Sequence, residues 1–199
     1  MSELVITRPT AIRGRWRDGY ALDFHTVSST HIGDDEFGNP KFETVRTAIG
    51  ELLYRLKYRK DMTAIGQIVD AITSFVGQWN PGMDTLVPVP PSRGRPAHPV
   101  AILAALIAPR LGLAYTPDAV RRTRAIPALK DIVDYTERAR LLDGVHSIDR
   151  SQVQGRRVLV FDDLYRSGAT MNAVTAVLFD VGLAADVCAL AITRTRSNR

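Results

Sequence analysis

Two adjacent carboxylates and the short loop of small residues after them form the part of this sequence best suited to chemistry. Residues 158–170 read Val-Leu-Val-Phe-Asp-Asp-Leu-Tyr-Arg-Ser-Gly-Ala-Thr, so an apolar run ends in Asp162 and Asp163. An apolar stripe at helical spacing follows, made of Val174, Val177, Leu178 and Val181. The loop therefore lies at a helix N-terminus, where free N–H groups and the helix dipole favour an anion. Carboxylates that accept hydrogen bonds from hydroxyls, next to an anion site, suit a sugar phosphate.

Other phosphate-binding patterns do not fit. The sequence has no Gly-x-x-x-x-Gly-Lys-Ser/Thr and no Gly-x-Gly-x-x-Gly after a strand, which argues against a P-loop nucleotidase and a dinucleotide fold. An acidic pair of the receiver type would follow an early strand, whereas this pair lies in the last quarter of the chain. The alternative interpretation is a strand end with two solvated aspartates before a capped helix.

The same segment closely resembles the phosphoribosyl-pyrophosphate motif of type I phosphoribosyltransferases. The resemblance implies that Asp162 and Asp163 hold the ribose 2- and 3-hydroxyls. It also implies that the loop wraps the 5-phosphate through Arg166, Ser167, Gly168, Ala169 and Thr170. Glycine lets the backbone approach closely, and the two hydroxyls can donate. The family often has Thr at the position of Arg166. The Arg166 side chain either adds a phosphate contact in this chain or points to solvent.

A second loop follows the segment Val87-Pro-Val-Pro-Pro-Ser-Arg93. Ligands of open α/β sheets bind beyond the carboxyl ends of the strands, so we expect this loop at the same edge as Asp163. The resemblance implies that Ser92, Arg93 and Gly94 bind pyrophosphate, with Mg²⁺ neutralising charge and with no protein side chain assigned as a direct metal ligand. The alternative is a proline-rich turn that only ends a strand.

A basic loop over 121–131 has the length of a mobile lid, which would exclude water and bring cations to a leaving group. By position in the resemblance, Arg122, Arg124 and Lys130 supply charge to the departing pyrophosphate. A solvated basic loop explains the same residues equally well.

The order of motifs also resembles ComF-type proteins, which are phosphoribosyltransferase-like and associated with DNA uptake. The shared order runs from Tyr54-Arg-Leu-Lys-Tyr58 through Pro-Val-Pro, the basic loop and Glu137-Arg138 to the Asp-Asp motif, over roughly 52–193. Typical members begin with a four-cysteine zinc module, and the single cysteine here is Cys188. They also carry Arg-Gly-Phe-Asn-Gln after Pro-Val-Pro, where this chain has Arg-Gly-Arg-Pro-Ala. Zinc binding is therefore not carried over.

Composition places the chain among ordinary globular proteins: 199 residues, 45% hydrophobic and 24% charged. One cysteine excludes a disulfide framework. The N-terminus lacks a signal-peptide pattern, and the longest apolar run, 100–108, is too short to span a bilayer, so we expect a cytoplasmic protein without a membrane partner. The net charge of +5 admits nucleic acid or acidic small substrates.

Strands and helices alternate along the chain. We expect a hairpin over 12–30 turning at Asp18-Gly19, and a polar loop at 33–40. The first expected helix covers 44–58, and the second is capped by Asp61 and ends at 80–82. A third helix ends near Ala108, where Pro109 stops it, and a fourth covers 135–142. Expected strands cover 85–90, 119–121, the run before Asp162 and 185–193. This pattern predicts an α/β fold with an open, mainly parallel sheet and helices on both faces. We expect one domain over 1–199, with an N-terminal hairpin or hood at 1–43 and the α/β core at 44–199.

Two functions follow. The first is an enzyme that binds phosphoribosyl pyrophosphate with Mg²⁺ and transfers the phosphoribosyl group to a nucleobase or another nitrogen acceptor. The second is a non-catalytic protein of ComF type that senses phosphoribosyl pyrophosphate or a nucleotide, or handles single-stranded DNA. The aromatic residues near the N-terminus, Trp16, Tyr20 and Phe24, are better explained by core packing than by base recognition. The acceptor is therefore not readable, and a homodimer stays open because family members are often dimers.

Overall fold

The computed structural model describes residues 5–91, 99–124, 132 and 134–196. The strands are β1 (Thr10–Ala11), β2 (Asp18–Phe24), β3 (Thr26–Asp34), β4 (Pro40–Arg46), β5 (Thr85–Pro88), β6 (Ala114–Tyr115), β7 (Val120–Arg122), β8 (His146–Ile148), β9 (Arg157–Tyr165) and β10 (Asp186–Arg194). The helices are α1 (Ala48–Tyr58), α2 (Ala64–Trp79), α3 (Pro99–Arg110), α4 (Tyr135–Leu142), α5 (Ala169–Asp180) and a 3₁₀ turn, η2 (Arg150–Gln152).

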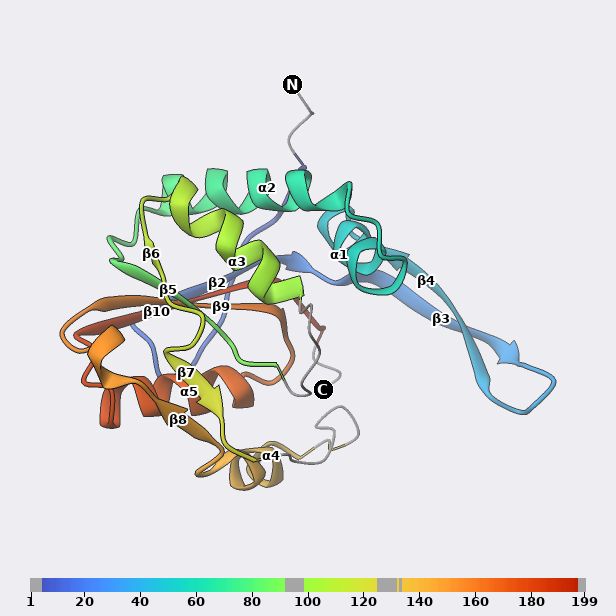
Figure 1. Ribbon diagram of the computed structural model, residues 1–199. Helices are drawn as coiled ribbons and strands as arrows, with labels where there is room; N and C mark the ends of the chain where they lie inside the picture. Colours follow the sequence, from blue (N-terminus) through green and yellow to red (C-terminus); the bar gives the residue numbers. More distant parts are fainter. Residues whose placement is uncertain (1–4, 92–98, 125–131, 133, 197–199) are drawn as a thin grey trace.

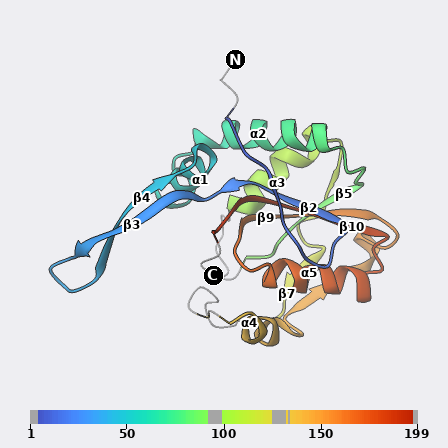
Figure 2. The same ribbon diagram turned by 180° about the vertical axis from the view of Figure 1, so that it is seen from behind.

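A six-stranded sheet runs through the body of the molecule in the order β1-β2-β10-β9-β5-β6 (Figure 1). Only the short edge strand β1 is antiparallel to its neighbour in this described sheet; the other pairs are parallel. The central strands are apolar on both faces, as buried parallel strands must be, and 158–161 and 187–192 are fully buried. Figure 2 shows the same sheet from behind, with β2 beside β10.

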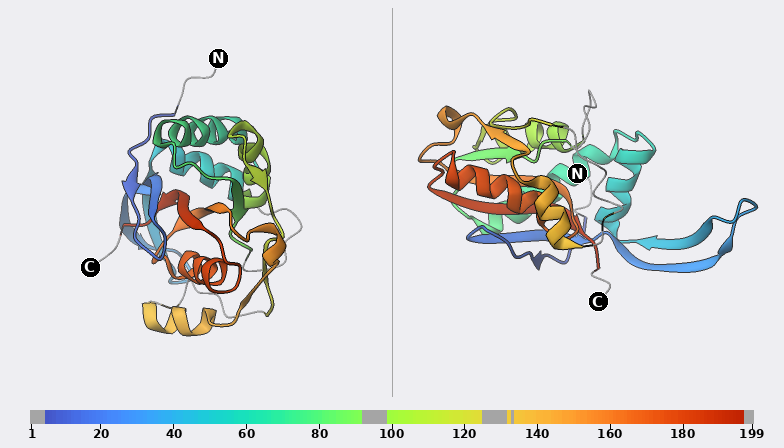
Figure 3. Two further views of the ribbon diagram at one scale, coloured as in Figure 1. Left: turned by 90° about the vertical axis from the view of Figure 1, so that its left-hand side faces the viewer. Right: turned by 90° about the horizontal axis from the view of Figure 1, so that it is seen from below.

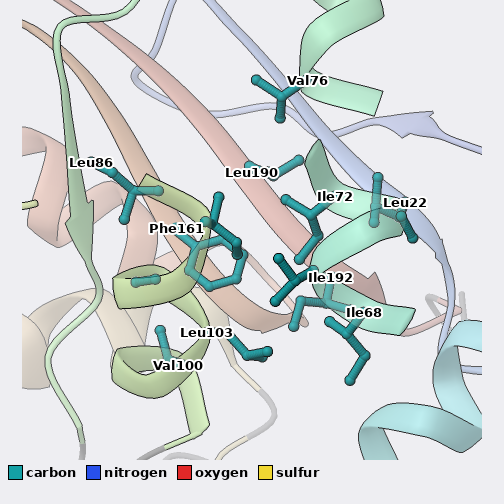
Figure 4. Close-up of a cluster of buried hydrophobic side chains, with 14 of the residues drawn as sticks. Leu22, Ile68, Ile72, Val76, Leu86, Val100, Leu103, Phe161, Leu190 and Ile192 are labelled. Carbon is teal, nitrogen blue, oxygen red and sulfur yellow. The ribbon is translucent and has the colours of Figure 1, made fainter. Parts of the chain in front are cut away.

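Helices cover both faces of the sheet, so the predicted fold class is confirmed. Because side chains alternate along a strand, β9 points Leu159 and Phe161 towards α1, α2 and α3, and Val158 and Val160 towards α5. Figure 4 shows Phe161 among Ile72, Leu103 and their neighbours on the first face. The same alternation sends the consecutive residues Asp162 and Asp163 to opposite faces.

Two small antiparallel ribbons lie outside the main sheet. β3 pairs with β4, and the ribbon they form projects away from the body (Figures 1 and 3). β7 pairs with β8 on the side of the sheet that carries α5 (Figure 1). Among the described residues no helix is long and apolar enough to cross a membrane.

The hairpin predicted over 12–30 is wrong. Asp18-Gly19 opens β2 instead of forming a turn, and β2 lies parallel to β10 in the main sheet. β1 and β2 pair as antiparallel neighbours through the connection 12–17, and the longer hairpin is β3–β4, closed where the Asp35 N–H donates to the Asn39 carbonyl at 2.8 Å. A turn-type dipeptide forms a hairpin turn only when its residues do not pair with another strand. Here Asp18 and Gly19 pair with Cys188 and Ala189 of β10. Tyr20 packs edge-on against Phe75 and Trp79, so core packing explains this aromatic residue.

Several predicted boundaries also shift. The first helix starts at Ala48, because 40–46 are paired in β4, and the Thr47 side chain accepts from the Gly50 N–H at 3.1 Å. The residue capping α2 is Thr63, while Asp61 accepts hydrogen bonds from Thr63 and Arg55. Pro109 lies in the last turn of α3, where its missing N–H costs one hydrogen bond and the helix runs on to Arg110.

Strands show the same kind of difference. β9 does not end at the carboxylates but stays paired with β10 as far as Tyr165. The short strand expected at 119–121 lies at Val120–Arg122 and pairs outside the main sheet. β6, two residues long, was not predicted, because only its pairing with β5 distinguishes it from a loop.

Candidate functional site

A pocket lies where β9 passes into the loop before α5. Its lining comprises Arg138, Asp162, Leu164, Tyr165, Arg166, Ser167, Gly168, Ala169, Thr170 and Met171. The structure thus brings together all five residues of the predicted 5-phosphate loop and one of the two predicted carboxylates. The volume is about 90 Å³, several times the ~10–15 Å³ that a cavity needs to hold one water molecule. A pocket of this size accommodates one phosphate group, and the rest of a larger ligand would extend beyond it.

The loop reaches α5 through a left-handed glycine. Gly168 is the N-cap residue with φ +78°, and a Cβ at this position would lie 2.8 Å from the Tyr165 ring. Both the dihedral and the close ring therefore require glycine. Tyr165 is held in turn, because its hydroxyl donates to the Arg13 carbonyl at 2.9 Å. The N–H groups of the first turn of α5 are consequently presented at a fixed place beside the pocket.

Arg138 brings a buried positive charge to this loop. It lies on α4, is 9% exposed, and its Nη1 donates to the Ser167 hydroxyl at 2.9 Å. Its Nε donates to the Ile132 carbonyl, just ahead of α4. α4 is fixed at its start by Asp134, whose carboxylate accepts from the Glu137 N–H at 2.7 Å. A guanidinium fixed at two points beside a helix N-terminus forms a site for a dianion.

Sequence reasoning noticed Arg138 only within the order of motifs and gave it no role. The signal available was its place on a short helix directly after the basic loop. Only the packing of α4 against the 166–170 loop, however, distinguishes Arg138 from the exposed Arg140 two positions later.

The two carboxylates point to opposite faces of the sheet. Because β9 continues through both, Asp162 shares the α5 face with Val160 and lines the pocket, whereas Asp163 shares the other face with Phe161. The Asp162 side chain also accepts from the Asp163 N–H at 2.8 Å. The structure therefore places Asp162 at the pocket and Asp163 outside its lining.

Asp163 is paired with a lysine that the sequence analysis did not assign to the site. Lys57, at the end of α1, donates from Nζ to the Asp163 carboxylate at 2.8 Å. Burial alone would lower the pKa of the Lys57 ammonium, and the contact with Asp163 outweighs it, so the pKa is raised and the group stays charged. The sequence analysis named Lys57 only as part of the Tyr54-Arg-Leu-Lys-Tyr58 stretch and gave it no role, because its contact with Asp163 spans 106 positions of the chain.

His25 and Thr193 complete the surroundings of Asp163. The Thr193 hydroxyl lies 3.3 Å from both the Asp163 carbonyl oxygen and His25 Nδ1. Burial, together with the nearby positive charges of Arg46 and Lys57, lowers the pKa of His25, so its ring is neutral at pH 7. This edge of the sheet therefore places the Lys57 and Arg46 cations near an imidazole whose pKa is lowered.

Asp162 differs from Asp163 in its electrostatic surroundings. Burial and the adjacent Asp163 raise the pKa of Asp162 to about 8. The two neighbouring carboxylates therefore differ: Asp163 is paired with the Lys57 ammonium, and the raised pKa of Asp162 favours its protonated form. A protonated carboxyl both donates and accepts, which suits a group that meets hydroxyls.

The other predicted site residues either lie outside the described residues or do not line the pocket. Ser92, Arg93, Gly94 and Lys130 lie outside the described residues. The chain leading to the first three starts beside the site, since the Val89 N–H donates to the Phe161 carbonyl at 2.8 Å. Arg122 lies on β7, where burial lowers its pKa, and Arg124 donates to the Asp143 carbonyl at 3.0 Å. Neither of these two arginines lines the pocket.

The donor set around the pocket does not form a metal site by itself. Within the described part of the chain, no group of three or more His, Cys, Asp or Glu side chains is arranged to hold an ion. Mg²⁺, however, is usually held by one or two carboxylates together with phosphate oxygens of a substrate. Asp162 would fit such an arrangement in its ionised form, with the ligand supplying most of the coordination.

Comparisons with known proteins give likenesses of structure only. No family model and no curated protein matches the sequence. Among solved structures, the chain is similar to adenine phosphoribosyltransferase from Saccharomyces cerevisiae, with 12% identity, a TM-score of 0.49 and 84% of each chain covered. The Trypanosoma brucei adenine enzyme, in complex with AMP, pyrophosphate and ribose-5-phosphate, shows 11% identity, a TM-score of 0.46, and coverage of 94% of this chain and 86% of that one. Hypoxanthine phosphoribosyltransferase from Trypanosoma cruzi shows 15% identity and a TM-score of 0.39, with 76% and 71% covered. Likeness at this level does not transfer an activity.

Proposed function

We propose that this protein binds phosphoribosyl pyrophosphate and transfers its phosphoribosyl group to a nitrogen acceptor. One observation carries the proposal: the whole 166–170 loop, the buried Arg138 and Asp162 line a single phosphate-sized pocket at the carboxyl end of β9. In this proposal the 5-phosphate occupies the pocket. It accepts hydrogen bonds from the backbone of the first turn of α5, the Thr170 hydroxyl and the Arg138 guanidinium.

The ribose lies above Asp162, whose carboxyl group meets the 2- and 3-hydroxyls. Asp163 acts with it from the other face, either directly after Lys57 has moved or through the field of the ion pair. Anchoring the phosphate remotely helps to orient C1, because binding energy from a non-reacting part of a substrate can be used for positioning.

Transfer breaks the bond between C1 and the diphosphate oxygen and forms a bond between C1 and the acceptor nitrogen. The diphosphate keeps the electron pair, and the acceptor nitrogen loses a proton to solvent or to a base. Positive charge develops on the ribose and is stabilised by negative charge on the carboxyl groups, for which Asp162 gives up its proton when the ligand binds. Ser92, Arg93, Gly94, Arg122, Arg124 and Lys130 are proposed to meet the diphosphate, and bound Mg²⁺ would neutralise part of its charge.

The deciding experiment compares two arginines of the same helix. Calorimetric titration with phosphoribosyl pyrophosphate and Mg²⁺ is carried out on the wild type, on Arg138→Met and on the matched control Arg140→Met, whose side chain is exposed. Loss of one charge-assisted contact of about 1.5–3 kcal/mol weakens binding by roughly ten- to a hundredfold for Arg138→Met. Affinity should be little changed for Arg140→Met. Equal affinity of all three proteins would contradict the placement of the 5-phosphate.

Turnover is tested separately. Diphosphate release is followed with a panel of nucleobases and other nitrogen compounds as acceptors, in the wild type and in Asp162→Asn. Release that depends on one acceptor and is lost in the variant supports the enzyme. Tight binding without release for any acceptor would instead indicate a sensor of the same ligand. Binding of single-stranded DNA that falls steeply with salt, without affinity for the sugar phosphate, would favour the nucleic-acid alternative.

A further inference from the structure

The acceptor of the proposed transfer approaches the ribose from a side that the strand order defines. In a direct displacement at C1, the incoming and leaving groups lie on opposite faces of the sugar ring. The residues proposed to meet the diphosphate, 92–94, follow β5, which pairs with β9 on one side. β10 pairs with β9 on the other side, and β2 lies beyond β10. We therefore expect the acceptor where β10 and β2 end.

His25 lies at this end of the sheet. It follows directly after β2, and its N–H donates to the carbonyl of Arg194, the last residue of β10, at 2.8 Å. The register pairs Phe24 with Arg194 and Arg194 with Tyr165, so His25 lies level with the start of the 166–170 loop. Gly50, in the first turn of α1, packs so closely on the His25 carbonyl that a Cβ would clash with it. The backbone of His25 is thus fixed from two sides.

The hydrogen bonds around the His25 ring decide which of its nitrogens carries the proton. The Thr193 hydroxyl lies 3.3 Å from the Asp163 carbonyl oxygen and 3.3 Å from His25 Nδ1. A carbonyl oxygen can only accept, so the single hydroxyl proton of Thr193 is directed to Asp163. Towards the ring the hydroxyl can then only accept, and Nδ1 donates. A neutral imidazole has one N–H, so the lone pair that can take up a proton lies on Nε2.

Nε2 of His25 is also accessible to a ligand. Within the described residues this atom has no hydrogen-bond partner. It is not among the side-chain atoms of those residues that are both fully buried and unpartnered. The ring is therefore held at Nδ1 inside the protein and open at Nε2, which is the arrangement that a proton acceptor needs.

The charges around the ring keep it available as a base. Burial, and then the positive charges of Arg46 on β4 and Lys57 on α1, lower the pKa of His25. Asp163 on β9 and Glu51 on α1 act in the opposite direction and offset only part of this. The neighbouring cations cannot take up a proton themselves, because Arg46 is a guanidinium and the raised pKa of Lys57 keeps its ammonium charged.

We propose that His25 is a catalytic base, whose Nε2 removes the proton from the acceptor nitrogen as this nitrogen bonds to C1. The acceptor nitrogen gives its lone pair to the new bond and regains one from its N–H bond. The bond from C1 to the diphosphate oxygen breaks with its electron pair on the oxygen, and His25 becomes an imidazolium. The positive charges beside the ring then favour release of this proton to solvent.

Thr193 is a positioning residue in this step, because its hydroxyl holds the His25 ring in the tautomer whose Nε2 carries no proton. The inference rests on the proposed function, to which it adds the group that receives the proton. The role of His25 and the transfer itself can nevertheless fail separately.

Nitrogen-15 NMR of the full chain with labelled histidine tests the tautomer without any substrate. The His25 signals are assigned by their absence in His25→Gln. Above pH 7 we expect the proton on Nδ1 in the wild type. In Thr193→Val, which lacks the accepting hydroxyl, the form with the proton on Nε2 should gain population. A wild-type ring that carries its proton on Nε2 overturns the proposal, whatever the activity of the protein.

Diphosphate release tests the role in the reaction. Phosphoribosyl pyrophosphate and Mg²⁺ are supplied with adenine, hypoxanthine or uracil to the wild type, to His25→Gln and to the control His31→Gln, whose side chain is 51% exposed on β3. We expect kcat to fall by about 10²–10⁴-fold in His25→Gln, the usual contribution of acid–base catalysis. Affinity for phosphoribosyl pyrophosphate, measured by calorimetry, should be little changed, which also shows that the variant is folded. His31→Gln should behave as the wild type.

The pH profile separates a base from a residue that only shapes the site. The ratio of the wild-type rate to the His25→Gln rate should fall as the pH is lowered through the pKa of His25, which lies below its ordinary value, because a protonated ring cannot accept. Deprotonation of Asp162 affects both proteins alike and cancels in the ratio.

The outcomes distinguish two failures. An unchanged kcat in His25→Gln, or a rate ratio that stays constant from pH 5 to 8, overturns the role of His25 and leaves the transfer standing. A wild type that binds phosphoribosyl pyrophosphate but releases no diphosphate with any of the acceptors overturns the transfer, and the role of His25 with it.

Discussion

The Lys57 ammonium and the Asp163 carboxylate lie 2.8 Å apart, and together they join the end of the first helix to the central strand β9. The side chains are 26% and 10% exposed, so the pair is largely removed from water. It holds Asp163 on the face of the sheet opposite the pocket. Consequently the neighbouring Asp162 meets the pocket alone, and its pKa is raised by burial and by the charge of Asp163.

Replacing the lysine should therefore destabilise the protein. Lys57→Met leaves the Asp163 carboxylate, in a residue only 7% exposed, without its cation. Because Lys57 is itself partly exposed, we expect a loss of about 1.5–3 kcal/mol in the free energy of unfolding, as for a hydrogen bond to a charged group. The measurement is urea unfolding at pH 7.

The matched control is Arg110→Met, which breaks the ion pair between Arg110 and Asp70, whose side chains are 52% and 41% exposed. An exposed pair of this kind contributes less than about 1 kcal/mol. If the two variants lose equal stability, the Lys57 pair does not have the buried character described here.

The raised pKa of Asp162 predicts how stability changes with pH. The folded protein retains a proton on Asp162 up to about pH 8, whereas the unfolded chain loses it near pH 4, so this group's contribution to stability falls as the pH rises between these values. Asp162→Asn removes the contribution. The variant should gain stability relative to the wild type as the pH is raised from 5 to 8.

Two histidines change the stability in the opposite direction in part of this pH range. The pKa values of His25 and His146 are lowered in the folded protein, so the unfolded chain binds protons that the folded protein does not. Their effect is common to both proteins and cancels in the difference. A stability difference between Asp162→Asn and the wild type that stays constant from pH 5 to 8 would refute the assignment.

His146 provides a direct spectroscopic test of the β7–β8 ribbon. Burial, with the positive charge of Arg122 nearby, lowers the pKa of His146 to about 4. Titration of the ring proton signals by NMR should show His146 still neutral at pH 5. An ordinary value near 6.5 would mean that the ring is more exposed in solution than the ribbon allows.

Gly168 should be essential to the loop. Gly168→Ala adds a Cβ where φ is +78° and the Tyr165 ring is 2.8 Å away, so the loop must move from the first turn of α5. We expect a stability loss of about 1–3 kcal/mol and weaker binding of ribose-5-phosphate. Calorimetric titration measures the second effect.

Gly112→Ala controls for backbone strain alone, since Gly112 has φ +67° and open space around its Cβ position. It should lose stability through the dihedral but keep its affinity for ribose-5-phosphate. Equal affinity in both variants would show that the 166–170 loop does not hold the phosphate.

The sequence by itself determined the local parts of this protein. Short apolar runs rich in β-branched residues read as parallel strands, because such strands are buried on both faces. The small-residue loop before α5 read as an anion site, because helix N-termini leave N–H groups free. The alternation of strands and helices was enough for the fold class. Each of these signals lies within a few consecutive residues.

Tertiary structure decided which distant residues meet. Asp18-Gly19 has the dipeptide of a hairpin turn, and only pairing with β10 makes it the start of a parallel strand. The extension of β9 to Tyr165 sends Asp162 and Asp163 to opposite faces, which a motif of adjacent acids cannot show. Lys57 reaches Asp163, and Arg138 reaches Ser167, across long stretches of chain. Such contacts depend on how helices pack on the sheet, and packing is a property of the whole chain rather than of any segment within it.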